Sequence, residues 1–179
     1  MLGGVLSPCC SRMEHITDKA VEAKFPELAK AGYRITSPAV RSYNCVAWAA
    51  NDTERWWWPD SSHLYSYWPS GVDRRLSCAS FVTAFATLGY APCKNGTLED
   101  GLEKVALYVD ESGVPTHMAR QLEDGAWTSK LGNWYDIRHE AVDGICGKNY
   151  GRVWSFLKRP NPFGHGPRDR GDLLGTLGI

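Results

Sequence analysis

The chain has 179 residues and carries 20 basic and 20 acidic side chains, so its formal net charge at neutral pH is zero. This length suits one domain, and a hydrophobic content of 43% is enough for a core without a metal or disulfide staple. Neutral charge gives no signal for a nucleic-acid partner, and no segment reaches the roughly 18 apolar residues of a membrane span.

The N-terminal part predicts two short helices. After a flexible leader over residues 1–13, residues 16–32 read as helix with a break before Pro26 and a stop at Gly32. Thr17 suits the N-cap of the first helix, and Pro26 suits the first turn of the second. The chain is then expected to be extended or looping up to Ser42.

Two further helices are predicted before any strand. Residues 43–54, "YNCVAWAANDTE", are rich in alanine and predict a helix of two to three turns. Ser42 or Asn44 would cap it, which puts Cys45 in its first turn. An aromatic, proline-bearing loop follows, and residues 75–90 predict another helix.

From residue 104 onward the hydrophobic period changes from that of a helix to that of a strand. Residues 104–113 alternate, and residues 115–132 contain two strand-like runs joined at Asp124-Gly125, a strong hairpin signal. The remaining predicted segments are a turn with a short helix over 133–149, a last strand over 150–160, and a flexible tail over 161–179. Helices followed by antiparallel strands predict an α+β fold in a single domain, residues 14–160.

Several of these elements carry side chains suited to nucleophilic catalysis. Cys45 lies at a helix start, where unpaired N–H groups favour a thiolate, and where its own N–H could help to stabilise an oxyanion. His117 lies on a predicted strand and could take the thiol proton. A third polar group would hold the imidazole in the right tautomer, and the candidates are Asp136, Ser129 and His139.

The segments "YNCVAWAANDTERWWWP", "KVALYVDESGVPTHMARQ", "WTSKLG" and "YDIRH" together resemble a family of small bacterial proteins similar to papain-like, NlpC-type cysteine peptidases. The resemblance covers residues 25–160. It implies a papain-like core with N-terminal helices packed on a small antiparallel sheet, with Cys45 as nucleophile and His117 as base. The third position of that family corresponds to Ser129.

The identity of the third residue depends on the hairpin register. A two-residue turn at Asp124-Gly125 would place Arg120 opposite Ser129, so that Ser129 would point away from His117. This count favours Asp136, whose carboxylate would also stabilise imidazolium directly. We therefore predict the site as Cys45, His117 and Asp136, with Ser129 or His139 as the alternative third residue.

Other motifs bear on ligands. The rings of Trp56, Trp57 and Trp58 are candidates for a substrate groove, although they could equally pack as a loop on the core. The cysteines and histidines lack zinc-ligand spacing, and no phosphate loop is present, so we expect neither a metal nor a cofactor.

The sequence therefore predicts a cysteine hydrolase that acts on an amide or acyl bond of a peptide or protein. Residues 1–15 lack a secretory signal, so we expect a cytoplasmic protein that binds neither membrane nor nucleic acid. Two alternatives stay open: a non-enzymatic binding module on a papain-like shell, and an effector or toxin domain that modifies another protein.

Overall fold

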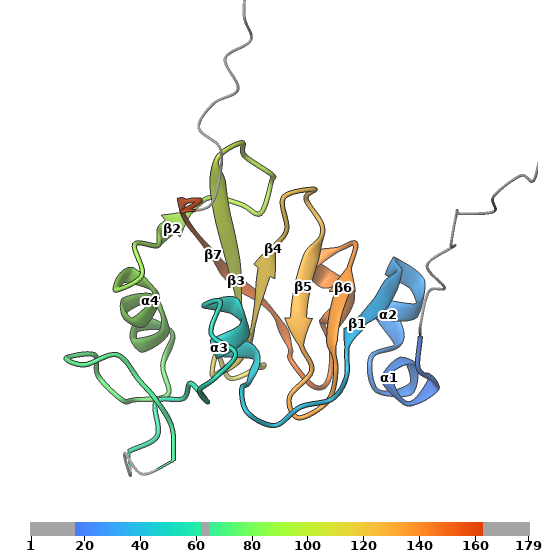
Figure 1. Ribbon diagram of the computed structural model, residues 1–179, viewed down its shortest axis with the longest axis horizontal. Helices are drawn as coiled ribbons and strands as arrows, with labels where there is room; N and C mark the ends of the chain where they lie inside the picture. Colours follow the sequence, from blue (N-terminus) through green and yellow to red (C-terminus); the bar gives the residue numbers. More distant parts are fainter. Residues whose placement is uncertain (1–16, 62–64, 163–179) are drawn as a thin grey trace, which may run out of the picture.

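A seven-stranded antiparallel sheet forms the centre of the computed structural model, which describes residues 17–61 and 65–162. The strand order is β1-β6-β5-β4-β3-β7-β2 (Figure 1). The strands are β1 Tyr33–Ser37, β2 Ala91–Cys93, β3 Leu102–Val109, β4 Pro115–Gln121, β5 Trp127–Lys130, β6 Asp136–His139 and β7 Arg152–Pro160. With the helices, this sheet confirms the α+β class.

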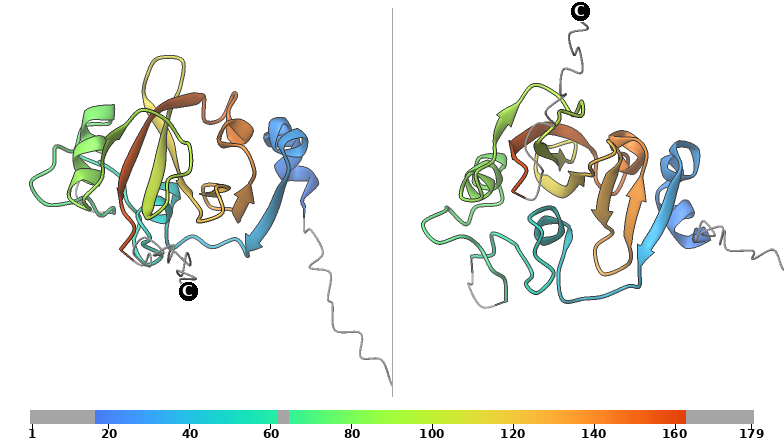
Figure 2. Two further views of the ribbon diagram at one scale, coloured as in Figure 1. Left: turned by 90° about the horizontal axis from the view of Figure 1, so that it is seen from above. Right: turned by 45° about the horizontal axis from the view of Figure 1, so that its top comes forward.

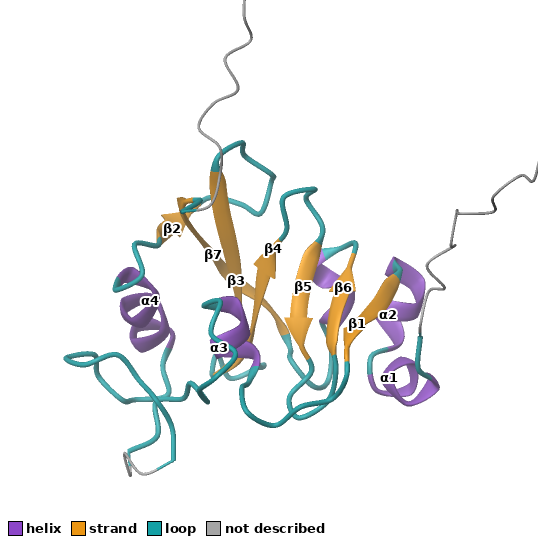
Figure 3. Cartoon of the chain, viewed as in Figure 1, coloured by secondary structure: helices purple, strands orange, loops and turns teal. Residues whose placement is uncertain are grey.

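The helices precede most of the strands, as predicted, but they are shorter (Figure 3). The helical elements are α1 Lys19–Lys24, α2 Pro26–Ala31, α3 Cys45–Ala49, α4 Cys78–Ala86 and the 3-10 helix η1 Val142–Ile145. Asp18, not Thr17, caps α1, because its carboxylate accepts the backbone N–H groups of Ala20 and Val21. The predicted leader and all but two residues of the predicted tail lie outside the described residues.

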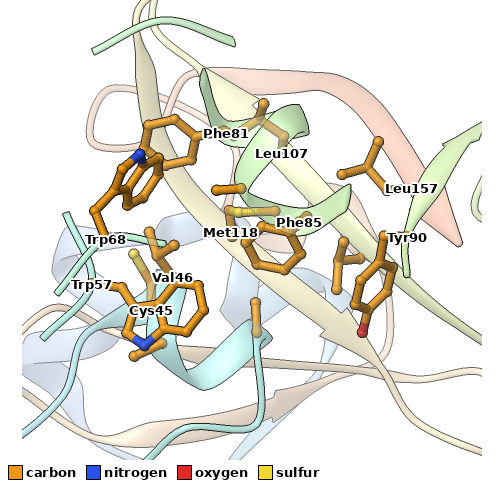
Figure 4. Packing of buried hydrophobic residues seen from close by; sticks show 14 of the residues in the cluster. Cys45, Val46, Trp57, Trp68, Phe81, Phe85, Tyr90, Leu107, Met118 and Leu157 are labelled. Carbon is orange, nitrogen blue, oxygen red and sulfur yellow. The ribbon is translucent and has the colours of Figure 1, made fainter. Parts of the chain in front are cut away.

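Each face of the sheet carries its own hydrophobic cluster. On one face α3, α4 and the loop between them, which carries Trp57 and Trp68 and is called the tryptophan loop below, pack against β3, β4 and β7. Figure 4 shows this packing for Cys45, Trp57, Phe85 and Met118. On the other face α1, α2 and η1 pack against the sheet. In Figure 2, β1 from the N-terminal part of the chain lies beside β6 from the C-terminal part. Alternate residues of one strand therefore belong to different clusters.

Asn44 fixes the start of α3. Its side-chain Oδ1 accepts the N–H of Ala47 at 3.1 Å and that of Trp57 at 3.3 Å, and its Nδ2 donates to the Trp57 carbonyl at 2.6 Å. The predicted N-cap is thus confirmed, with Cys45 as the first helical residue. Because α3 is only five residues long, these bonds to the tryptophan loop supply much of what holds it in place.

The β4–β5 hairpin differs from the predicted one by one residue in its turn. Arg120 pairs with Thr128 and Gln121 with Trp127, so the loop is longer than two residues and the predicted pairing of Arg120 with Ser129 is wrong. The Leu122 N–H bonds to the Ala126 carbonyl and closes a loop that contains Glu123-Asp124-Gly125. A one-residue change moves Ser129 to the opposite face from the one predicted.

Three strands, β1, β2 and β6, were not predicted as strands, and all lie at or near sheet edges. Residues 136–139, expected within a turn, form β6, and β1 pairs with it from Tyr33–His139 to Ser37–Asp136. The short strand β2 falls in a segment expected to be a loop. Among the described residues no helix is long and apolar enough to cross a membrane.

Candidate functional site

A buried chain of hydrogen bonds links three side chains from three adjacent strands. His117 Nε2 lies 3.1 Å from Ser129 Oγ, and the same oxygen lies 3.0 Å from His139 Nε2. His139 Nδ1 lies 2.7 Å from the carbonyl oxygen of Ala141. All three side chains are fully buried. We call His117, Ser129 and His139 the imidazole–hydroxyl relay.

The Ala141 carbonyl determines which ring nitrogen of each histidine in this relay carries the proton. A carbonyl only accepts, so His139 Nδ1 carries a proton and its Nε2 is an acceptor for the Ser129 hydroxyl. Ser129 Oγ then accepts from His117 Nε2–H. Neutral His117 is thereby held with its lone pair on Nδ1, and this atom is buried without a hydrogen-bond partner in the described structure. An imidazole in this tautomer can accept a proton at Nδ1.

Asp136, the predicted third residue, lies in a different cluster. Its Oδ2 accepts hydrogen bonds from the hydroxyls of Ser37 and Tyr43, the latter at 2.5 Å. Its Oδ1 lies 4.0 Å from Lys130 Nζ and has no hydrogen-bond partner in the described structure. The structure thus brings Ser129 and His139 to His117, and it brings Asp136 to Lys130. We call Ser37, Tyr43, Lys130 and Asp136 the Lys130 cluster.

Cys45 is the first residue of α3, which packs against β4 and β5. It belongs to the cluster that contains Met118, whereas the His117 ring packs on Tyr108 and Tyr150 toward the other face. The β4–β5 ladder stops at the Arg120–Thr128 pair, and the backbone N–H of Met118 acts to lower the pKa of the Cys45 thiol. Thiol and imidazole therefore approach the same stretch of β4 from opposite faces, without a hydrogen bond between them.

Burial dominates the acidity of both groups. It raises the pKa of the Cys45 thiol to about 11, although the N–H groups of Met118, Val46 and Cys45 itself and the charge of Lys130 act to lower that pKa. Burial, together with the neighbouring His139, holds the pKa of His117 well below its ordinary value. The resting pair is therefore a neutral thiol and a neutral imidazole. The N–H groups at the helix start favour the thiolate, as expected from the sequence, but burial opposes it more strongly.

Tyr150 covers His117 and was not singled out from the sequence. Its ring stacks on the imidazole with centroids 4.0 Å apart, and on its other side it stacks on Phe25 at 5.1 Å. Its carbonyl accepts from Thr116 Oγ1 at 2.7 Å. Burial raises the pKa of Tyr150, and a negative charge at Cys45 acts in the same direction. The sequence signal was weak: one tyrosine between two glycines.

The three adjacent tryptophans separate. Trp57 is buried in the core, and its indole N–H donates to Asp52 at 2.7 Å. Trp56 and Trp58, with Tyr65 beside them, line a hollow of about 390 Å³. A second hollow, of about 530 Å³, lies at the end of β4 beside Arg120. Cys45 and His117 line neither of these two hollows.

The described residues contain no group of three or more histidine, cysteine or acidic side chains placed to hold a metal ion. Their four cysteines, Cys45, Cys78, Cys93 and Cys146, are free thiols. The site described above offers a thiol, two imidazoles and a hydroxyl for nucleophilic and acid–base chemistry.

Acid is expected to destabilise the fold through the relay. Burial lowers the pKa of His139 from 6.5 to about 4 in the folded state. Below pH 6.5 the unfolded chain gains a proton that the folded chain excludes, so stability falls with pH until His139 protonates near 4. At about pH 5 the loss from His139 is about 2 kcal/mol relative to neutral pH, and His117 adds to it in the same direction.

Urea unfolding at about pH 7 and about pH 5, with an NMR titration of the His139 ring, measures this effect. The variant His139→Asn serves as the control, since it removes one of the two titrating rings and should flatten the dependence. A His139 that titrates at its ordinary pKa would contradict the prediction.

Residues 34–158 match the model of a family described as a domain of unknown function, DUF7689. The match covers most of the chain and includes Cys45 and every residue of the relay and of the Lys130 cluster. No curated protein and no solved structure gives a significant match.

Proposed function

The chain belongs to the DUF7689 family, whose function is unknown, and from the geometry of its site we propose that it is a cysteine hydrolase acting on an amide or related acyl bond. Cys45 is the nucleophile, His117 the base, and Ser129 the group that orients the imidazole. His139 holds Ser129 in turn. The substrate is a peptide or protein, and the location we propose is the cytoplasm, where the thiol stays reduced.

The observation that carries this proposal is the direction of the protons in the relay. A structural histidine in a core normally has both ring nitrogens satisfied, because an unpaired buried acceptor costs about 1–3 kcal/mol. His117 Nδ1 is left unpaired while Nε2 is fixed through Ser129 and His139 to the Ala141 carbonyl. Such an arrangement suits an acceptor whose proton comes from another group, and Cys45 approaches the same stretch of β4.

The reaction follows from these roles. Cys45 Sγ and His117 Nδ1, which share no hydrogen bond in this structure, must first come within hydrogen-bond range of each other. His117 Nδ1 then takes the Cys45 proton as the sulfur attacks the carbonyl carbon, so a C–S bond forms and imidazolium is produced. The imidazolium then gives its proton to the leaving amine as the C–N bond breaks. Water, deprotonated by His117, hydrolyses the thioester and returns the free thiol. Because the resting pair is neutral, the thiolate forms during attack and does not exist beforehand as an ion pair.

The arrangement of elements supports the papain-like resemblance as part of this proposal. A cysteine at the first residue of α3 packs against an antiparallel sheet, and the histidine follows on β4, with the orienting group on β5. The departure from the predicted site is the third residue. We propose Ser129 in place of Asp136, because the longer hairpin loop brings the Ser129 hydroxyl to His117.

A small activated ester tests the proposal without knowledge of the substrate. With p-nitrophenyl acetate we expect a burst of p-nitrophenolate and an acetyl group on Cys45, found by mass mapping of peptides. The other free thiols, Cys78, Cys93 and Cys146, are internal controls that should acetylate more slowly, although they are less buried. Cys45→Ala should lose the burst. Acetylation of Cys45 no faster than that of the controls would refute the hydrolase.

A non-enzymatic binding module remains the second candidate function. The observation that favours it is the closed state of the site: Cys45 is 6% exposed, and neither hollow described above reaches it. On that reading the relay and Cys45 only hold β4, β5 and α3 together. The absence of a burst, combined with a marked loss of stability in Cys45→Ala, would favour this candidate.

A further inference from the structure

We propose that Lys130 is an electrostatic positioning residue for Cys45: its buried ammonium group stabilises the negative charge that develops on the sulfur. This role deepens the proposed function and rests on it for its use in catalysis, but the charge effect itself is independent of turnover. Lys130 thus complements His117, which removes the proton from the other side of β4.

The ammonium of Lys130 is enclosed by the protein and is only partly neutralised. The side chain is fully buried, its Nζ donates to the Trp134 carbonyl, and it lies 5.3 Å from the centre of the Tyr43 ring. An ammonium has three N–H donors. Its acidic neighbour Asp136 is 4.0 Å away, which is too long for a hydrogen bond, and the Oδ2 of that carboxylate is occupied by Tyr43 and Ser37. Positive charge therefore remains available to a further neighbour.

We infer that the Cys45 sulfur is the neighbouring group on which this positive charge acts. Lys130 follows Thr128 by two residues on β5, so both side chains lie on one face of the sheet, and Thr128 Oγ1 accepts from the Trp48 indole of α3 at 3.0 Å. Met118 and Cys45 share one hydrophobic cluster, on the face that α3 covers. Tyr43, under the ammonium, is two residues before Cys45 in the chain. Lys130 therefore lies on the face of the sheet that carries Cys45, beside the start of α3.

The charged and titratable groups around the sulfur come from each element packed on it. They are Tyr43 before α3, His117 on β4, Lys130 on β5, Asp136 on β6 behind Lys130, and Tyr150 before β7. His117 is neutral and burial raises the pKa of both tyrosines, so Lys130 is the positive charge of this set. In agreement, Lys130 lowers the pKa of the thiol and Cys45 raises that of the ammonium, although burial outweighs each effect.

Two charge-changing variants should shift the reactivity of Cys45 in opposite directions. The measurement is the rate of Cys45 alkylation by iodoacetamide in the full chain, followed by mass mapping from about pH 6 to about pH 8. Lys130→Met removes the positive charge and should slow alkylation about tenfold at each pH. Asp136→Asn removes the opposing negative charge and should speed it several-fold. Lys130→Arg keeps the charge and should stay within about threefold of the parent.

Opposite signs separate an electrostatic role from a structural one, because loosening the core would expose the thiol and speed alkylation in every variant. Lys104→Met is the matched control, since Lys104 is also fully buried but pairs with Glu99 at 2.5 Å; alkylation of Cys45 should not change in it. An unchanged rate in Lys130→Met, or a change of the same sign in both variants, overturns the proposal. Should Lys130→Met not fold, the absence of acceleration in Asp136→Asn overturns it alone.

Alkylation needs no catalytic turnover, so the two proposals fail separately. If the ester produces no burst but the opposite shifts appear, Lys130 sets the acidity of a thiol that is not a hydrolase nucleophile. If the burst appears without the shifts, the hydrolase stands and the role of Lys130 is refuted.

Discussion

Replacing Ser129 with alanine is expected to lower the rate of Cys45 acetylation by p-nitrophenyl acetate about 100-fold, the scale of an impaired general base. The hydroxyl accepts from His117 Nε2 and donates to His139, so its loss leaves the imidazole free to take the other tautomer, with the proton on Nδ1. Asp136→Asn, by contrast, should not slow acetylation. The same assay on the two purified variants thus decides between the two candidates for the third residue.

Thr128→Ala provides the matched control for Ser129→Ala. Thr128 precedes Ser129 on β5, is also buried, and its hydroxyl makes two hydrogen bonds, with the Trp48 indole at 3.0 Å and the Ile137 carbonyl at 3.0 Å. It points to the other face and takes no part in the relay. We expect acetylation within about threefold of the parent in Thr128→Ala, with a stability loss of about 1 kcal/mol. Equal slowing in both variants would show that Ser129 acts only through stability.

The conservative variant Ser129→Thr gives a further readout. It keeps a hydroxyl on the strand, and β-branched residues suit β5, so it should recover much of the rate if its methyl group is accommodated. A rate as low as that of Ser129→Ala, in a protein of normal stability, would contradict the relay mechanism.

The position of Cys45 at the start of a helix was predictable from sequence because it depends on a hydrogen bond between neighbouring residues. Ser42 or Asn44 before an alanine-rich segment is an N-cap signal that needs no long-range contact, and it correctly put Cys45 in the first turn of α3, which Asn44 caps. His117 lies in a strand-like run that ends before the Asp124-Gly125 hairpin signal, and this context predicted a strand. Local pattern placed these two residues on their elements, and the resemblance to papain-like peptidases supplied their expected roles.

The partners of His117 were not predictable in the same way. Which face Ser129 takes depends on the number of residues in the β4–β5 loop, and Asp124-Gly125 fits a two-residue turn as well as the longer loop observed. His139 lies on a four-residue strand, which is too short for a period to be read, and it pairs with β1 about a hundred residues earlier. Such contacts are set by tertiary packing, which no short window of sequence contains.

Gly151→Ala is expected to destabilise the protein by about 4 kcal/mol or to prevent folding. A Cβ at this position would lie 1.9 Å from the carbonyl oxygen of Val109, so the backbone of β3 or of the Tyr150 loop would have to move. The residue also has a φ of +71°, which strains any L side chain. Urea unfolding at neutral pH, followed by tryptophan fluorescence, gives the difference in free energy.

Gly113→Ala separates the steric clash from the backbone strain. Gly113 has a similar φ of +82°, but a Cβ there would meet no atom within 4 Å, so only the left-handed conformation costs stability, about 1 kcal/mol. Equal losses in the two variants would contradict the close approach of Gly151 to β3. That approach matters for the site because Gly151 N–H and Gly147 N–H each bond to the other's carbonyl and close the loop that carries Tyr150. A shift at Gly151 should therefore displace the ring that stacks on His117, and any Gly151→Ala protein that folds should expose the imidazole and raise its pKa toward the ordinary value.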